Sequence, residues 1–255
     1  MPEEIPLGGN LNDAVRVGDT VRRRAGPWTP TVHALLRFLE AQGFPAPRVR
    51  GIDEEGREIL EYVEGQAHSG HPTPLPDTVF TEEQLIASAR LLRRYHDVVN
   101  RFQAPQNAHW RLVSPKPHEV ICHNDWTPWN AIFRDGQFLL MVDWDLAGPG
   151  PRIWDVANAA ACWVPFLRGH GVPEVREPFR RLRLFCEAYG LDDRASLLMA
   201  LRDRTRYLVG FVASEAKGGD PGMQKLDAAN APERLRNDLE RFIERHRADL
   251  DRALA

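Results

Sequence analysis

The order of local signals along the chain limits its fold most, because strands joined by tight turns come first and helices follow. Residues 14–24 and 48–65 each alternate weakly about a turn that contains Gly and Asp, which predicts two hairpins. Between them, residues 28–44 place apolar side chains at helical spacing, and Gly43 predicts the end of that helix. The first 65 residues therefore predict antiparallel strands with one helix.

The rest of the chain has mainly helical spacing, with one strand-rich segment inside it. A capping box at Thr81 and Gln84 opens one helix, and the last apolar stripe at helical spacing covers residues 235–250. In the strand-rich segment, Asp135-Gly136 lies between two apolar runs and predicts a third hairpin. The sequence therefore predicts a mixed α+β protein.

The composition is that of an ordinary globular protein. The chain has 255 residues, of which 43% are hydrophobic and 27% charged. Lys and Arg number 33 against 36 Asp and Glu, and the net charge of −3 argues against a nucleic-acid partner. The three cysteines lie far apart and indicate no disulfide framework, and the acidic start of the sequence has no apolar signal segment. We therefore expect a cytoplasmic protein with no membrane partner.

A dense polar run, from His123 to Asn130, follows an apolar, strand-like segment. Asp125 lies inside this run, and Asp143 and Asp145 come one predicted hairpin later. An ionised aspartate that is buried without partners costs several kcal/mol, so these carboxylates need a cation, a polar network or solvent. Carboxylate and amide oxygens are also the ligands that Mg²⁺ prefers.

The predicted hairpin gives this polar cluster a geometry. Its turn folds the chain back and brings Asp143 near Asn130, so one carboxylate and one amide oxygen could share a Mg²⁺. Asp125 would then act as a base. Metal on the phosphates and a carboxylate that positions the attacking hydroxyl are the parts that phosphoryl transfer needs. An isolated His-x-Asp pair is usually an ordinary loop feature, but the whole combination is far more specific.

Two segments, HNDWTPWN and MVDWDLAGPGPRIWDVA, resemble the catalytic and metal loops of the aminoglycoside phosphotransferase or choline-kinase-like family of small-molecule kinases. The similarity extends to GGNLN and AVRVGDTVRRR near the start, to LEYVEG and to ARLLRRYHD. This resemblance implies a protein-kinase-like two-lobed α+β fold. Its small antiparallel β-rich N-lobe would cover residues 1–65, with a hinge near 61–65, and its larger, mainly helical C-lobe would cover residues 66–255.

The resemblance also implies roles for the residues of the polar cluster. Asp125 matches the catalytic aspartate, which orients or deprotonates the acceptor hydroxyl. His123 is assigned to the catalytic loop together with Asp125, and it matches a residue that mainly holds this loop in place. Asn130 and Asp143 match the Mg²⁺ ligands. The resemblance leaves Asp145 open between a second metal contact, a supporting contact and a substrate contact.

The family's nucleotide site matches residues in the first part of the chain. The backbone carbonyl of Glu61 and the N–H of Val63 match the hinge groups that hydrogen-bond adenine. Gly8, Gly9 and Asn12 match the loop that covers the phosphates. The resemblance therefore implies ATP as the phosphate donor, with GTP as an alternative, and Mg²⁺ as the cofactor.

The phosphate-binding lysine of kinase-like proteins is missing, because no lysine precedes Lys116. Aligning TVRRRAG places Arg22 at its position, with Arg23 as the adjacent alternative, and an arginine can hold phosphate through two nitrogens. A solvated basic strand face is the other interpretation of these arginines. The glutamate that normally pairs with the lysine is also missing, since its expected site falls at Val32 or His33. The ion pair that organises the N-lobe is therefore absent or rebuilt.

These observations lead to one leading hypothesis and two alternatives. We expect a phosphotransferase that moves the γ-phosphate of ATP or GTP to a hydroxyl of a small molecule, either an aminoglycoside-like antibiotic or a metabolite. A non-catalytic nucleotide- or ligand-binding pseudokinase is the main alternative, because the lysine–glutamate pair is missing. A metal-dependent phosphohydrolase would not explain the hinge-like LEYVEG. The sequence leaves the acceptor and the oligomeric state open.

Overall fold

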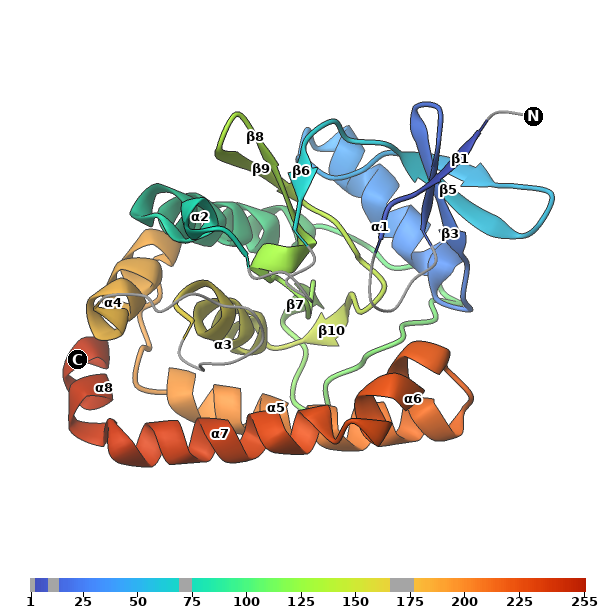
Figure 1. Ribbon diagram of the computed structural model, residues 1–255. Coiled ribbons are helices and arrows are strands. Elements are labelled where there is room, and N and C mark those ends of the chain that lie inside the picture. The colour runs from blue at the N-terminus through green and yellow to red at the C-terminus, as the bar shows by residue number, and fades with distance from the viewer. Residues whose placement is uncertain (1–2, 9–13, 69–74, 166–176) are drawn as a thin grey trace. The chain divides into compact units, whose positions relative to one another are not determined.

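The computed structural model describes residues 3–8, 14–68, 75–165 and 177–255 (Figure 1). The chain divides into two compact units, one formed by residues 1–69 with 94–151 and the other by residues 70–93 with 152–255. The described strands belong to the first unit, and the second is helical. The α+β class predicted from the sequence is confirmed. The lobe boundary at residue 65 stays a prediction, because the two units are defined by packing alone.

Within the described part of the first unit, a five-stranded antiparallel sheet is made of β1 (Glu4–Pro6), β2 (Val15–Val17), β3 (Thr20–Arg24), β4 (Val49–Ile52) and β5 (Arg57–Glu61). Strands β2 and β3 form the first predicted hairpin, and β4 and β5 form the second. Strands β3 and β5 pair with each other, so that Arg23 stands directly opposite Glu58. The sequence did not indicate β1, which pairs with β2.

Helix α1 (Thr29–Ala41) is the helix predicted between the two hairpins, and it lies beside the sheet in Figure 1. Its buried face carries four core side chains that are at most 1% exposed: Val32, Leu35, Leu36 and Leu39. Gly43 follows the helix with a φ of +64°, a left-handed conformation that glycine adopts without strain. This confirms the predicted position of the helix and its stop.

The described residues of the first unit also form two smaller antiparallel sheets: one contains β6 (Gln66–Ala67), β8 (Ala131–Arg134) and β9 (Gln137–Met141), and the other β7 (Val120–Cys122) and β10 (Gly148–Gly150). Asp135 and Gly136 connect β8 to β9 with φ values of +51° and +74°, as a two-residue hairpin turn requires. The third predicted hairpin is therefore confirmed. Strand β10 was not foreseen, because its sequence Gly-Pro-Gly has little strand propensity.

Gly148 allows β10 to approach the preceding loop closely. A Cβ built at this position would lie 1.8 Å from the carbonyl oxygen of Leu112, which is a backbone atom and cannot rotate away. We therefore expect Gly148→Ala to lower the free energy of unfolding by about 1–3 kcal/mol, measured by urea denaturation. Gly210 is the matched control, because nothing lies within 4 Å of its Cβ position and it sits inside a helix. Gly210→Ala should be neutral or stabilising, and equal stability of the two variants would contradict the prediction.

The second unit is a set of helices: α3 (Arg152–Trp163), α4 (Pro178–Tyr189), α5 (Leu197–Lys217), α6 (Pro221–Ala228), α7 (Ala231–Arg245) and α8 (Arg247–Leu254). Helix α5 packs against α3, α6 and α7, and α4 packs against α8. Figure 1 shows α7 running alongside α5. None of the helices among the described residues is long and apolar enough to cross a membrane.

Helix α2 (Glu82–Val99) follows the short 3-10 helix η1 (Asp77–Phe80) and passes from the second unit into the first. The side chain of Thr81 accepts a hydrogen bond from the Gln84 N–H at 3.4 Å, as expected for the first half of the predicted capping box.

The apolar stripe over residues 235–250 is not one continuous helix. The chain leaves helical geometry at His246, with φ −114° and ψ 21°, and α8 then begins at Arg247. Leu239, Ile243 and Leu250 are all buried across this break. The apolar residues keep their helical spacing across the break between α7 and α8, so the sequence pattern did not indicate the break.

Candidate active site

The polar run begins immediately after β7, and His123 holds its first turn in place. The Asp125 N–H donates to the His123 Nδ1 at 3.2 Å, and the His123 ring lies 4.4 Å, centroid to centroid, from that of Trp144. Asn124 has a φ of +65°, and its side-chain amide donates to the Leu146 carbonyl at 2.9 Å. The buried His123 ring therefore supports the loop from below, which fits the bracing role expected for it.

Asn130 fixes the side chain of Asp125. Its Nδ2 donates to Asp125 Oδ2 at 2.7 Å and to the Asp125 backbone carbonyl at 3.1 Å. Asn130 is 8% exposed and closes the short 3-10 helix η2 (Pro128–Asn130), whereas Asp125 is half-buried. The loop thus presents one oriented carboxylate at a partly accessible position.

The β8–β9 hairpin brings Asp143 back to the same loop. The Val142 N–H donates to the Asn130 carbonyl at 2.8 Å, and Ala131 pairs with Met141 across the hairpin. Asp143 has a φ of +58°, and its side chain is 36% exposed. The proximity of Asp143 to Asn130 that the hairpin predicted is therefore present in the backbone.

Asp143 and Asn130 together suit a cation that also binds water or substrate oxygens. Among the described residues, no group of three or more His, Cys, Asp and Glu side chains could enclose a metal ion. Asp143 and Asn130 supply one carboxylate and one amide oxygen. Mg²⁺ is commonly bound by one or two carboxylates together with waters and substrate phosphates, so these residues fit such an ion.

The side chains of the neighbouring residues Arg22 and Arg23 on β3 bind different carboxylates. The Arg22 Nη1 donates to Asp53 Oδ2 at 3.2 Å, in the turn between β4 and β5. The Arg23 guanidinium donates through Nη1 to Asp143 at 3.0 Å and through Nη2 to Asp145 at 2.6 Å. The structure therefore brings Arg23 to the predicted metal ligand and places Arg22 away from it, because neighbouring residues of a strand face opposite sides.

Arg23 has a further partner that the sequence did not reveal. Its Nε donates to Glu58 Oε2 at 2.5 Å, and the other oxygen of Glu58 lies 2.9 Å from His33 Nε2. Glu58 is 1% exposed on β5, and His33 is buried on α1. The only sequence signal was that these polar side chains stand at core positions of their elements.

The charges of this network are unequal. Asp143, Asp145 and Glu58 bind the Arg23 guanidinium, and Arg111 adds a second positive charge near Asp145. Three carboxylates therefore stand against two guanidinium groups. Burial alone would lower the pKa of Arg23, but Asp145, Glu58 and Asp143 raise it well above its ordinary value. Burial raises the pKa of Asp145 to about 6, with Arg23 opposing the shift. The excess of negative charge favours binding of a cation beside Asp143.

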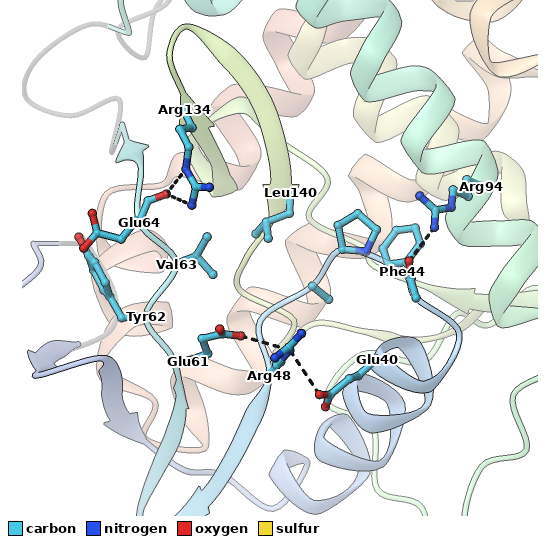
Figure 2. A pocket seen from close by; sticks show the side chains of 13 residues that line it. Glu40, Phe44, Arg48, Glu61, Tyr62, Val63, Glu64, Arg94, Arg134 and Leu140 are labelled. Carbon is cyan, nitrogen blue, oxygen red and sulfur yellow. Dashed lines mark hydrogen bonds and ion pairs between the residues drawn. The ribbon is translucent and has the colours of Figure 1, made fainter.

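The residues that match the hinge line a cavity, which is separate from the Arg23 network. A cavity of about 600 Å³ is lined by Glu61, Tyr62, Val63 and Glu64, together with Phe44, Arg48, Arg134, Leu140 and others. In Figure 2 the Val63 side chain points toward Leu140. The Glu61 Oε2 lies 3.7 Å from the Arg48 Nε. No residue of the Arg23 network lines this cavity. Within the described residues, the Val63 N–H donates to no backbone carbonyl.

The residues matched to the phosphate-covering loop are only partly described. Gly8 has a φ of +71°, and nothing lies within 4 Å of its Cβ position. Gly9 and Asn12 lie outside the described residues. The assignment of this loop therefore stays a prediction.

Comparison with known proteins places this site in a family. Residues 100–198 match the model of the phosphotransferase enzyme family, APH. A trifolitoxin immunity protein from Rhizobium leguminosarum bv. trifolii is 37% identical over 206 residues, which cover 75% of this chain and 76% of that protein.

Solved structures share the fold at low sequence identity. An amicoumacin kinase in complex with AMP-PNP, Ca²⁺ and Ami has a TM-score of 0.67 at 13% identity, covering 93% of this chain and 87% of that one. A choline/ethanolamine kinase family protein from Mesorhizobium loti has a TM-score of 0.63 at 15% identity, covering 99% and 92%. A gentamicin complex of APH(2″)-IIa has a TM-score of 0.54 at 13% identity, covering 97% and 90%.

The chain belongs to the phosphotransferase enzyme family, and its fold is the protein-kinase-like fold of aminoglycoside and choline kinases. The members of this family are phosphotransferase enzymes, and the chain belongs to that enzyme class. The resemblance of the two polar loops is thereby confirmed at the level of family, fold and enzyme class.

Proposed function

We propose that the protein transfers the γ-phosphoryl group of ATP to a hydroxyl of a small molecule, with Mg²⁺ as cofactor. The observation that carries the proposal is the oriented Asp125 carboxylate, held at 2.7 Å by Asn130, with Asp143 at the base of the following hairpin. Asn130 and Asp143 would hold the metal, which neutralises charge on the phosphates when bound.

The proposed reaction is a direct in-line transfer. The acceptor oxygen bonds to the γ-phosphorus, the bond from that phosphorus to the β,γ-bridging oxygen breaks, and ADP leaves with those electrons. Asp125 receives the acceptor proton as the new bond forms. Its hydrogen bond from Asn130 keeps the carboxylate directed, which reduces the freedom that would otherwise be lost on reaching the transition state.

Arg23, rather than Arg22, is the arginine that we assign to the phosphates. It is buried beside Asp143, whereas Arg22 pairs with Asp53 at a turn. The Arg23 Nη1 and Nη2 each carry a second N–H besides the one that binds Asp143 or Asp145, and the guanidinium remains charged at any physiological pH. The backbone of Glu61 and Val63 would hold adenine, as matched from the sequence.

We infer that the acceptor is an antibiotic or toxin-like molecule with a hydroxyl group. The support is that the relative with 37% identity is a toxin immunity protein by name, and that an amicoumacin kinase shares the fold. An acceptor from ordinary metabolism is the competing choice, since choline/ethanolamine kinase relatives share the same fold.

A thermal-shift titration with ATP, GTP and ADP, each with and without Mg²⁺, tests the proposed nucleotide site. A ligand at 100 times its Kd stabilises the native state by about 2.7 kcal/mol. In a chain of this size that is expected to raise Tm by roughly 5–10 °C. A Mg²⁺-dependent shift with ATP would support the proposal and lead to a panel of hydroxylated acceptors. No shift with any nucleotide would contradict it, and nucleotide binding without turnover of any acceptor would favour the pseudokinase alternative.

A further inference from the structure

All three guanidinium nitrogens of Arg23 bind a carboxylate. Its Nε meets Glu58, its Nη1 meets Asp143 and its Nη2 meets Asp145, at 2.5, 3.0 and 2.6 Å. The side chain is 7% exposed. A lysine ammonium is a single point charge on a flexible stem and could not bridge these positions, so the rigid fork of arginine suits this network specifically.

Glu58 connects this guanidinium to helix α1. It stands opposite Arg23 in the β3–β5 register, so its side chain projects from the same face of the sheet. One of its oxygens binds Arg23, and the other lies 2.9 Å from His33 Nε2. Together Arg23 and His33 overcome the effect of burial and hold the pKa of Glu58 below its ordinary value.

We propose that His33 is a positioning residue for the phosphotransferase site. Through Glu58 it fixes the Arg23 guanidinium, and with it Asp143, in the arrangement that receives the metal-bound triphosphate. This inference rests on the proposed function and deepens it. The lysine–glutamate contact between strand and helix is here replaced by a chain of three residues, Arg23, Glu58 and His33.

The geometry explains why the acidic partner is on a strand rather than on the helix. His33 occupies the helix face that points at the sheet, where it contacts Glu58 and is 5% exposed. The only acid of α1, Glu40, lies near the end of the helix and contacts Arg48 instead. A shift of α1 would therefore reach Asp143 by way of Glu58 and Arg23.

Replacement of His33 tests the proposal through nucleotide binding. The probes are MgATP, with affinity measured by calorimetry, and the slow hydrolysis of ATP by water, which needs no acceptor. We expect His33→Leu to raise both the Kd and the KM for MgATP about tenfold, the lower end of the loss when a supporting partner of a metal site is removed. The kcat for hydrolysis should change much less. His33→Gln, whose amide can still donate to Glu58, should restore most of the affinity.

A matched exchange separates a positioning role from a general loss of stability. His118 is exposed and contacts the Ser114 carbonyl, so His118→Leu should leave the Kd for MgATP unchanged. Circular dichroism and urea denaturation verify folding, and His33→Asn replaces the leucine variant if that variant does not fold. A folded His33→Leu or His33→Asn with the wild-type Kd overturns the inference, as does a His33→Gln that binds no better than His33→Leu. If the wild-type protein itself binds no MgATP, the proposed function fails together with it.

Discussion

Asp125→Asn is expected to reduce the rate of phosphoryl transfer by about 10²–10⁴-fold, the usual contribution of a positioned acid–base group. The exchange keeps the size of the side chain, and the new amide oxygen can still accept the hydrogen bond from Asn130. The lost property is the negative charge that takes up the acceptor proton. The measurement is single-turnover transfer from ATP to the acceptor found in the panel, beside calorimetric binding of MgATP.

Binding of MgATP should be nearly unchanged in Asp125→Asn, because Asp125 is not among the groups assigned to the metal or the phosphates. Asp135→Asn is the matched control, since Asp135 is exposed at the tip of the β8–β9 hairpin and its φ of +51° is one that asparagine tolerates. That variant should react at the wild-type rate. Wild-type turnover in Asp125→Asn would show that another group acts as the base.

Asp143→Asn is expected to remove the Mg²⁺-dependent part of nucleotide binding. A neutral amide is a weaker ligand for a hard cation than a carboxylate. Loss of a residue that only supports a metal ligand weakens metal binding ~10–100-fold. Asp143 is itself a proposed ligand, so we expect the Kd for MgATP to rise by at least that factor. In the thermal-shift experiment, ATP with Mg²⁺ should then stabilise the variant no more than ATP with a chelator does.

The stability of the ligand-free Asp143→Asn protein should change little. Arg23 keeps Glu58 and Asp145 as charged partners, and asparagine tolerates the φ of +58° at this position. Asp135→Asn again serves as the control. If Asp143→Asn retains a full Mg²⁺-dependent shift, the metal is held elsewhere, and the assignment of Asn130 and Asp143 is wrong.

The sequence predicted the parts of this fold that depend on local chemistry. Both N-terminal hairpins, helix α1 with its stop at Gly43 and the Asp135-Gly136 turn all follow from turn residues and apolar spacing. The neighbourhood of Asn130 and Asp143 follows as well, because the two-residue turn folds β9 back along β8. The turn did not predict the register shift between Ile132 and Phe133.

The contacts that depend on register and on distant partners could not be predicted in the same way. A shift of one residue decides whether Arg22 or Arg23 faces the site, and the sequence alignment cannot resolve it. Glu58 and His33 are brought to Arg23 by the pairing of β3 with β5 and by the packing of α1, which no local signal encodes. Strand β10 forms because its glycines allow close approach, not because its residues favour strands.

The use of arginine at the centre of this site has a consequence for chemical labelling. Reagents that deliver an acyl group from a nucleotide to a nearby amine depend on a lysine beside the phosphates. This chain has lysine only at 116, 217 and 225, and Arg23 carries a guanidinium that stays protonated and does not accept an acyl group readily. A reagent of this kind would therefore meet a guanidinium, and no amine, at the position that Arg23 occupies.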